Sequence, residues 1–139
     1  MQYQFLNSID RDFSTPLILA IHHKKYALVK ILLDHPKTCL RQSSMKYGTS
    51  LHVALSNHEF KTSYKLLKML RNVRDFNPIQ DLNKIDDEGN NPLHITMRIF
   101  NKEQVLCSKI ALFLIKRGVN LQFKNKKKLT PLLFALYYA

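Results

Sequence analysis

The sequence is poor in cysteine, glycine and long hydrophobic runs, and these shortages exclude several classes of protein. Its two cysteines, Cys39 and Cys107, are far apart and match no metal-ligand spacing. A small disulfide-bonded protein carries more of them, so we expect two reduced, partly buried thiols. Three glycines and five prolines are too few for a linker or a low-complexity tail. No apolar run reaches the roughly 18 residues of a membrane helix, and the opening residues MQYQFLNSID do not resemble a secretory signal.

Acidic residues are also scarce. Lysine and arginine number 22 against 10 aspartates and glutamates, which gives a formal net charge of +12. A positive field of this size attracts acidic proteins, nucleic acid or anionic membrane surfaces, and composition alone does not choose among them. The length of 139 residues and the 45% of hydrophobic residues suit one domain with a substantial core. The expected location is the reducing cytoplasm, or a host cytosol if the chain belongs to an injected bacterial effector.

Four similar blocks recur along the chain, and they decide the expected fold. Their starts are 34, 42 and 39 residues apart, and a helical stretch follows each of the first three. The blocks are DRDFSTPLILA (10–20), SMKYGTSLHVA (44–54), DDEGNNPLHIT (86–96) and NKKKLTPLLFA (125–135).

These blocks resemble the ankyrin repeat, in which an acidic residue and a turn glycine precede Thr-Pro-Leu-His and a small residue. The third block keeps Gly89, Pro92, Leu93 and His94. The departures are Phe13 and Lys128 for the glycine, Ile18 and Leu133 for the histidine, Ser50 for the proline and Asn91 for the threonine. The resemblance implies an all-α ankyrin-repeat solenoid of helix-turn-helix units joined by short hairpin turns, with a role in binding other proteins.

The physical chemistry of the blocks agrees with this fold. Thr15, Thr49 and Thr130 precede helical patterns and are suitable N-caps, and a proline next to such a cap loses no hydrogen bond. Helical spacing places Leu17, Ala20 and Ile21 on one buried face, and Leu28, Ile31 and Leu32 on another. Gly118 is expected to end the helix that begins near Cys107. Neither helix of a unit buries its apolar face alone, so the units must stack.

The blocks also set the expected boundaries. We predict a single domain over 1–139, with repeats at about 10–43, 44–85, 86–124 and a partial 125–139, and residues 1–9 as the tail of a preceding unit. The chain is therefore expected to be a fragment of a longer protein. Extra residues relative to a unit of about 33 are expected near 59–63 and 71–79, and again near 98–106. Such insertions are either neutral surface additions or parts of a binding face.

No catalytic, cofactor or metal motif stands out. His52 and His94 occupy the histidine position of the repeat, where the resemblance implies that the ring bonds the backbone of the turns. His22 and His23 are adjacent on a helix and point in different directions, which disfavours a metal site. The run Asp86-Asp87-Glu88 lacks the alternating ligands of a calcium loop and is expected at a solvated hairpin tip. We expect no enzyme activity in these residues, no cofactor and no small-molecule substrate.

A basic run near the end of the chain leaves three interpretations open. It is a solvated hairpin flank, a surface for an acidic protein, or a site for nucleic acid or lipid headgroups. Phe123 is the one aromatic residue within it, which is little for stacking on bases. The cations are Lys116, Arg117, Lys124, Lys126, Lys127 and Lys128.

The resemblance to ankyrin repeats also implies a binding groove made of hairpin tips and of the exposed ends of the inner helices. The tip positions are Arg11, Asp12, Ser14, Met45, Lys46, Asp87, Glu88, Asn90, Lys126 and Lys127. The helix-end positions are His22, His23, Ser56, Asn57, Arg98, Ile99, Tyr137 and Tyr138. Charge along the tips runs mixed, basic, acidic, basic, which favours a partner protein with an acidic or alternating-charge surface. Exposed Met45, Ile99, Tyr137 and Tyr138 are the expected anchors.

The expected function is therefore protein–protein interaction by a chain that is monomeric on its own. One alternative is the targeting or substrate-recruiting domain of a larger enzyme or injected effector. The other is electrostatic binding to nucleic acid or anionic membrane, whose affinity would fall steeply with salt.

Overall fold

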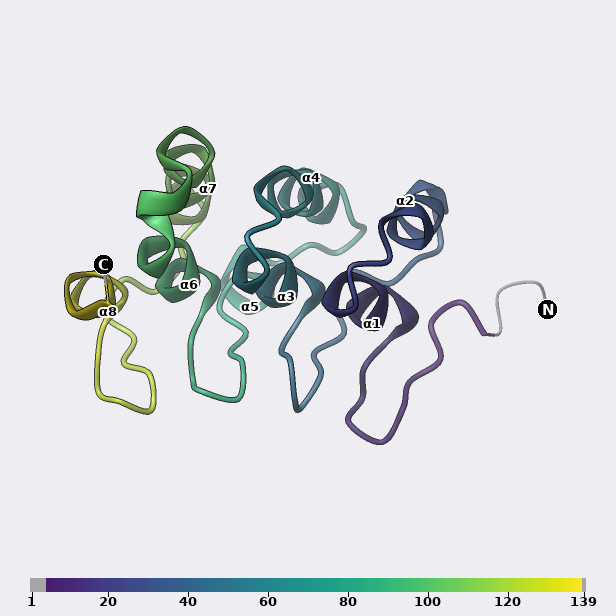
Figure 1. Cartoon of the computed structure of the whole chain (residues 1–139), viewed down its shortest axis with the longest axis horizontal. Coiled ribbons are helices and arrows are strands. Elements are labelled where there is room, and N and C mark those ends of the chain that lie inside the picture. Colours follow the sequence, from purple (N-terminus) through teal and green to yellow (C-terminus); the bar gives the residue numbers. More distant parts are fainter. Residues whose placement is uncertain (1–4, 139) are drawn as a thin grey trace.

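The computed structural model describes residues 5–138, which form stacked helix pairs (Figure 1). Among these residues no strand forms, and one isolated bridge joins Ser44 to Gly48. The predicted fold class, an all-α solenoid of stacked helical units, is confirmed. The helices are α1 (Pro16–His22), α2 (Tyr26–Asp34), α3 (Ser50–Ser56), α4 (Phe60–Arg71), α5 (Pro78–Asp81), α6 (Pro92–Arg98), the 3-10 helix η1 (Phe100–Lys102), α7 (Gln104–Lys116) and α8 (Pro131–Tyr138).

Two layers of helices make up the stack. The inner helices α1, α3, α6 and α8 lie side by side, and the outer helices α2, α4 and α7 each cover one inner helix (Figure 1). Hairpin loops project from the inner layer on the side opposite the outer helices (Figure 1). Part of the predicted preceding unit, residues 1–4, and the last residue of the predicted fourth repeat, Ala139, lie outside the described residues.

The inner helices begin at the predicted caps. The hydroxyls of Thr15 and Thr49 accept hydrogen bonds from the backbone N–H groups of Ile18 and His52. Thr130 does the same for Leu133 at the start of α8. In α6 the cap is Asn91, whose amide oxygen accepts from the backbone of His94. Asparagine therefore replaces threonine without loss of the cap, as its similar capping preference predicts.

Three of the four hairpins share one turn geometry. Oδ1 of Asp10, Asp86 or Asn125 accepts from the backbone N–H groups two and four residues later. The fourth residue of each turn has a positive φ: 63° at Phe13, 78° at Gly89 and 67° at Lys128. Two of the three are not glycine, so the side-chain hydrogen bonds hold a conformation that the residue itself disfavours.

The second hairpin differs because serine starts it. The Ser44 hydroxyl accepts from the backbone N–H groups of Lys46 and Tyr47, one residue apart. The positive φ moves one position along, to Gly48 at 77°. A Cβ at Gly48 would lie 2.9 Å from the ring of His52, so this position requires glycine for space as well as for conformation.

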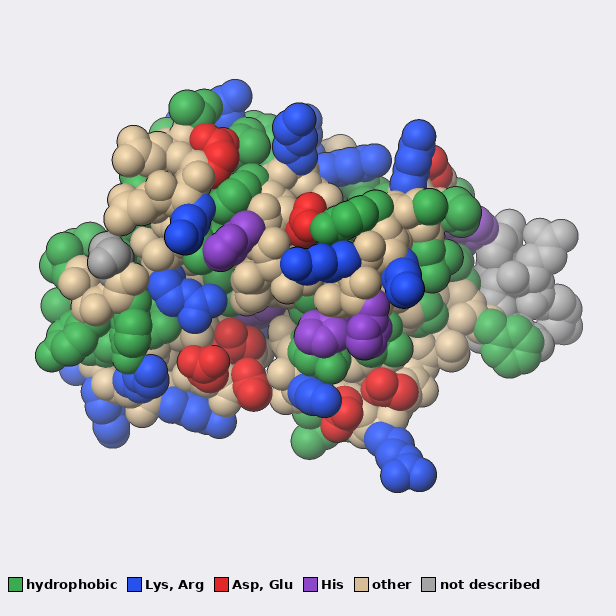
Figure 2. All heavy atoms as spheres, viewed as in Figure 1, with side chains coloured by type: hydrophobic (Ala, Val, Ile, Leu, Met, Phe, Trp, Pro, Cys, Tyr) green, Lys and Arg blue, Asp and Glu red, His purple; other side chains and the backbone are tan. Residues whose placement is uncertain are grey.

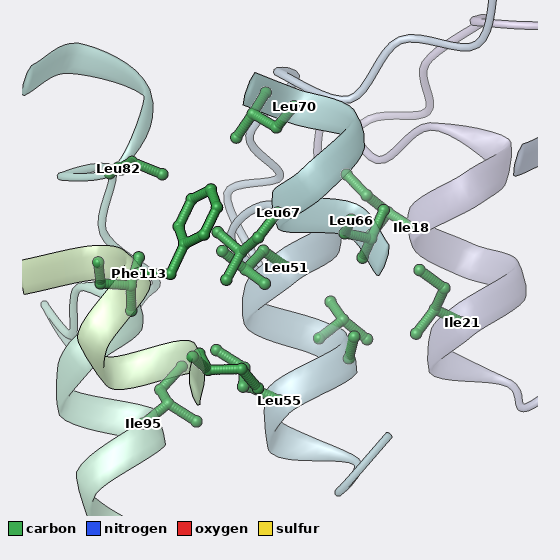
Figure 3. Packing of buried hydrophobic residues seen from close by; sticks show 14 of the residues in the cluster. Ile18, Ile21, Leu51, Leu55, Leu66, Leu67, Leu70, Leu82, Ile95 and Phe113 are labelled. Atoms are coloured by element: carbon green, nitrogen blue, oxygen red, sulfur yellow. The ribbon is translucent and has the colours of Figure 1, made fainter. Parts of the chain in front are cut away.

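The core runs continuously through the stack. Ile18 and Ile21 of α1, Leu51 and Leu55 of α3, and Ile95 of α6 point into one apolar layer (Figure 3). Leu66, Leu67 and Leu70 of α4, together with Phe113 of α7, cover this layer from the outer side (Figure 3).

The predicted buried face of α2 is wrong in part. Leu32 is buried, but Leu28 and Ile31 are 45% and 66% exposed, and Val29 and Leu33 are buried instead. The apolar stripe is therefore rotated from the predicted one. The segment Tyr26–Leu33 is apolar at all positions but Lys30, so periodicity does not distinguish the two faces.

The extra residues of the second unit are placed differently from the prediction. Residues 57–59 link α3 to α4, just as 23–25 link α1 to α2, so the predicted insertion near 59–63 is wrong. The surplus lengthens α4 to 12 residues, against 9 in α2, and adds α5 within the predicted segment 71–79 and just beyond it. In α5 the Asp81 carboxylate pairs with Arg41 at 2.9 Å, which anchors α5 to the hairpin before it. In the third unit the link 99–103 is two residues longer than in the first two units and includes η1, and α7 has 13 residues against 9 in α2.

Two further sequence expectations concern cysteine and the membrane. Cys39 is half-buried, Cys107 is buried, and both are free thiols. Burial and then Glu103 raise the pKa of Cys107 to about 11. Across residues 5–138, no helix combines the length and hydropathy needed to cross a bilayer.

Candidate partner-binding groove

A cavity of about 200 Å³ lies between the second and third units, where hairpin tips meet inner-helix ends, and it extends to His22 of the first unit. It joins residues that are up to 76 positions apart in the chain, from His22 to Arg98. Predicted partner-binding positions make up most of its wall: His22, Lys46, Ser56, Asn57, Asp87, Glu88, Asn90 and Arg98. Tyr47, Val53 and Asp86 complete it and were missed from the sequence.

One wall of the cavity is aromatic. The rings of His22 and Tyr47 lie 4.2 Å apart between centroids, and the Lys46 ammonium is 5.3 Å from the Tyr47 centroid. Burial, followed by the nearby charges of His23 and Lys46, lowers the pKa of His22. The lowered pKa favours the neutral imidazole, and the wall offers two adjacent rings to a ligand. Tyr47 follows the predicted tip residues Met45 and Lys46 and was not among the positions that the resemblance assigned to the groove.

The opposite wall is acidic. Asp87 and Glu88 are exposed at the third hairpin, and Figure 2 shows a group of acidic side chains at this place on the surface. Asp86 stabilises the turn instead, because its carboxylate accepts hydrogen bonds from the backbone N–H groups of Glu88 and Asn90. The two exposed carboxylates are thus held on a turn that Asp86 fixes.

Helix ends supply the remaining polar groups. The Arg98 guanidinium lies 5.7 Å from the centre of the Phe134 ring, which fixes a cation beside the carboxylates. Asn57 Nδ2 donates to the backbone oxygen of Ile21 at 3.0 Å and so ties α3 to the end of α1. Asn57 therefore positions the wall, while Arg98 and Ser56 present groups to the cavity.

The structure corrects three predicted positions, whose side chains are buried. Ser14 is 1% exposed and shares a 2.8 Å hydrogen bond with the hydroxyl of Ser44. Asn90 is also 1% exposed, and its oxygen accepts from Asn125 Nδ2 at 2.8 Å. Both join neighbouring hairpins. The expected exposure of Ile99 is wrong as well, because at 5% exposed it packs in the core where α6 turns into η1.

The other predicted positions lie outside the cavity, on several units. Arg11, His23, Met45, Lys126, Lys127, Tyr137 and Tyr138 are exposed, and Asp12 is half-buried. Neighbouring tips are joined through the backbone, since the N–H of Met45 donates to Asp12 and that of Lys126 to Glu88. At the last tip, Lys127 Nζ donates to the Tyr138 hydroxyl at 2.6 Å. The partner-binding role of these exposed positions stays a prediction.

The two repeat histidines have the expected structural role. His52 Nδ1 accepts from the Thr49 backbone N–H, so Nε2 carries the proton and donates to the Asn90 oxygen at 3.0 Å. His94 makes the matching bonds to Asn91 and, at 2.9 Å, to the Leu129 oxygen. Within the described part of the chain, no group of His, Cys, Asp and Glu side chains is arranged to hold a metal ion.

The predicted basic run does not form one surface. Lys116 and Arg117 end α7 in the outer layer. Lys126, Lys127 and Lys128 occupy the fourth hairpin, on the opposite side of the stack (Figure 1). Residues close in sequence are thus divided between two faces of the molecule.

Comparison with known proteins supports the repeat assignment in outline. No protein-family model matches the chain. The sequence is similar to Rabankyrin-5 from Mus musculus and from Homo sapiens, with 24% identity over 131 residues in each case. The match covers 94% of the chain but 10% of each relative, so the chain spans about a tenth of the length of the curated relatives it matches. The described residues therefore form an all-α region that is similar in sequence to part of Rabankyrin-5.

Proposed function

We propose that the chain is an ankyrin-repeat module that binds another protein through its concave groove. The observation that carries this proposal is the cavity between the second and third units. It combines an aromatic pair, two exposed carboxylates and a fixed guanidinium at the place where hairpin tips meet helix ends. This mixture of an apolar surface with directed charges suits a protein side chain or loop better than a small apolar ligand.

The charges of the groove indicate the charge pattern of a partner that would fit it. Asp87 and Glu88 fit a basic side chain, whereas Lys46 on one side and Lys126 and Lys127 on the other fit acidic ones. A partner segment with alternating charge matches this order, and a shift by one unit places like charges together. The exposed side chains of Met45 and Tyr137, 66% and 73% accessible, would add apolar contact at the rim.

In a longer protein, such a module would recruit a substrate or partner for activities encoded elsewhere. The relatives that match the chain are about ten times its length, which is the observation that favours this form of the proposal. The residues of the chain itself are proposed to take no part in catalysis and to bind no cofactor.

The test is affinity capture from a cell extract, with washes at low and high salt, and mass spectrometry of what remains bound. The double variant Asp87→Lys/Glu88→Lys reverses the acidic wall. Its matched control reverses two carboxylates outside the groove, Asp34→Lys/Asp75→Lys, both exposed. A protein that is retained at high salt by the wild type and by the control, but lost by the groove variant, supports the proposal.

Two other results would contradict the proposed function. One is a partner set that is identical for the groove variant and the wild type. The other is retention of nucleic acid alone, released by salt, which would assign binding to net charge.

A further inference from the structure

A second group of positive charges lies away from the concave groove, on the neighbouring outer helices α4 and α7. On α4 the exposed cations follow one another along the helix at Lys61, Lys65, Lys68 and Arg71. On α7 and just after it they are Lys109, Lys116 and the half-buried Arg117. These two rows belong to neighbouring outer helices that contact each other.

A groove runs between these two helices. Its cavity of about 240 Å³ is lined by Tyr64 of α4 and by Lys109, Leu112, Phe113, Lys116 and Arg117 at α7. We call it the outer groove. Every charged side chain in its wall is positive. Among residues 5–138 the ion pair that forms joins Arg41 to Asp81, so the cations of the outer groove have no carboxylate within salt-bridge distance.

Two of the three acids that flank these helices in the sequence are engaged, and the third, the exposed Asp75 after α4, does not line the outer groove. Glu59, before α4, accepts a hydrogen bond from the Tyr26 hydroxyl at 2.7 Å. Glu103, before α7, accepts from the backbone N–H groups of Val105 and Leu106 as the helix N-cap. Both stand at the N-terminal ends of the helices, whereas the cations continue to the C-terminal ends. The wall of the outer groove therefore carries positive charge and no carboxylate.

Aromatic rings hold several of these cations in place. The Arg117 guanidinium lies 3.8 Å from the centre of the Phe113 ring, and that of Arg71 reaches the same ring at 5.8 Å. Lys68 lies 5.0 Å from the centre of the Tyr64 ring. A guanidinium resting on a ring keeps its N–H groups free for a carboxylate and loses little conformational freedom on binding.

Stabilisation of the helix ends explains only some of these charges. Cations in the last turn of a helix interact favourably with its dipole, which accounts for Lys68, Arg71 and Lys116. Lys61, Lys65 and Lys109 lie earlier in their helices, so their position has no such explanation.

We propose that the outer groove binds an acidic segment of another protein, in addition to the partner of the concave groove. One row of cations follows α4, whose 12 residues correspond to about 18 Å, and the other lies on α7 beside it. An extended chain covers this distance with about five or six residues. The fitting ligand is thus a short run of aspartate and glutamate, with the exposed Leu112, 54% accessible, as an apolar contact in the wall.

The structure favours a peptide over nucleic acid as the occupant. Single-stranded nucleic acid is held by bases stacked on open aromatic faces. In the outer groove the Phe113 ring is 8% exposed and carries two guanidinium groups, and the Tyr64 ring carries the Lys68 ammonium. Binding of carboxylates requires only the cations, and none of these cations is paired with a carboxylate of the described residues.

The test measures fluorescence anisotropy with the full chain and a labelled octaglutamate peptide at low and moderate salt. The groove variant is Lys68→Gln/Lys109→Gln/Lys116→Gln. Its matched control, Lys30→Gln/Lys37→Gln/Lys102→Gln, removes three exposed lysines outside both grooves and so changes the net charge equally. We expect about tenfold weaker binding for the groove variant, the effect of three exposed ion pairs, and little change for the control. Circular dichroism of both variants checks that they fold.

Three results would overturn the inference: no binding of the peptide by the wild type at low salt, an equal loss of affinity in both variants, or retained affinity in the folded groove variant. The same assay with oligothymidylate and with phosphatidylserine vesicles tests the other polyanions. If one of these binds more tightly than the peptide and is lost specifically in the groove variant, the assigned occupant is wrong.

Discussion

Replacement of His52 by alanine is expected to destabilise the whole stack, because this side chain joins the second unit to the third. Its ring is 1% exposed and spans from the Thr49 backbone N–H, at 3.0 Å, to the Asn90 carbonyl oxygen, also at 3.0 Å. The Asn90 oxygen keeps a second hydrogen bond, from the backbone N–H of Asp86. The Thr49 N–H, in contrast, loses its partner.

The expected loss of unfolding free energy is the sum of the effects at the two hydrogen bonds of the His52 ring. A buried N–H left without a partner costs about 1–3 kcal/mol, and the lost hydrogen bond to Asn90 about 0.5–1.5 kcal/mol more. The sum, about 1.5–4.5 kcal/mol, is a large part of the roughly 5–15 kcal/mol that stabilises a domain. His23→Ala is the control, since that ring is exposed and the expected change is within about 0.5 kcal/mol.

Urea unfolding followed by circular dichroism at pH 7.5 measures both variants. We expect a much lower midpoint for His52→Ala and an almost unchanged one for His23→Ala. A loss below about 1 kcal/mol for His52→Ala would mean that water replaces the ring in both hydrogen bonds, and the argument for a tie between units would fail.

Other expected outcomes test the titration, the core and the thiols. Burial lowers the pKa of His52 and His94, so the unfolded chain binds protons first, and the urea midpoint should fall as pH drops below about 6.5. A midpoint that stays constant between pH 7.5 and 5.5 would refute this. Leu67→Ala, at a fully buried position, should cost about 2–5 kcal/mol in the same unfolding assay, whereas Leu112→Ala, 54% exposed, should cost less than about 0.5 kcal/mol. Because burial raises the pKa of Cys107 to about 11, Ellman's reagent at pH 8 should modify half-buried Cys39 first; equal rates for the two thiols would contradict the structure.

Much of the fold could be predicted because the helix caps and turns of each repeat depend on residues that are close in sequence. Thr15, Thr49 and Thr130 cap their helices as expected, since a cap depends on neighbours within three residues. The repeat comparison also assigns the turn position to Phe13 and Lys128, and both have the positive φ that glycine normally supplies. In these turns the side chains of Asp10 and Asn125 accept the same backbone hydrogen bonds as Asp86 does in the turn that contains Gly89.

The errors arise where the outcome depends on packing between units. The face of α2 was misassigned because that helix is apolar on nearly all sides, and only its contact with α1 decides which residues are buried. Ile99 was expected at the surface because it stands at the end of an inner helix. In the structure η1 begins just after it and Ile99 joins the core. Insertions such as η1 and α5 have no counterpart in the other units, so the repeat pattern gives no information about their course.

The candidate site was predictable in its inner part and not in its outer part. The concave positions follow from the resemblance to ankyrin repeats, because the pattern fixes which residues stand at hairpin tips. The outer groove depends on the spacing of α4 and α7, which brings Tyr64, with Lys68 over its ring, beside Lys109, more than 40 residues later in the chain. In the sequence these lysines look like ordinary solvent-exposed helix residues.

The two grooves should respond differently to salt, because their charges are arranged differently. In the concave groove, Lys46 and Arg98 stand close to Asp87 and Glu88, so the charges nearly cancel beyond a short distance. Binding there depends on short contacts and should change little as the Debye length falls from about 10 Å at 0.1 M salt. The outer groove has cations without carboxylates, so its field extends outward and mainly raises the association rate, an effect that salt removes. A partner retained at high salt therefore belongs to the concave groove, and one lost at moderate salt to the outer groove.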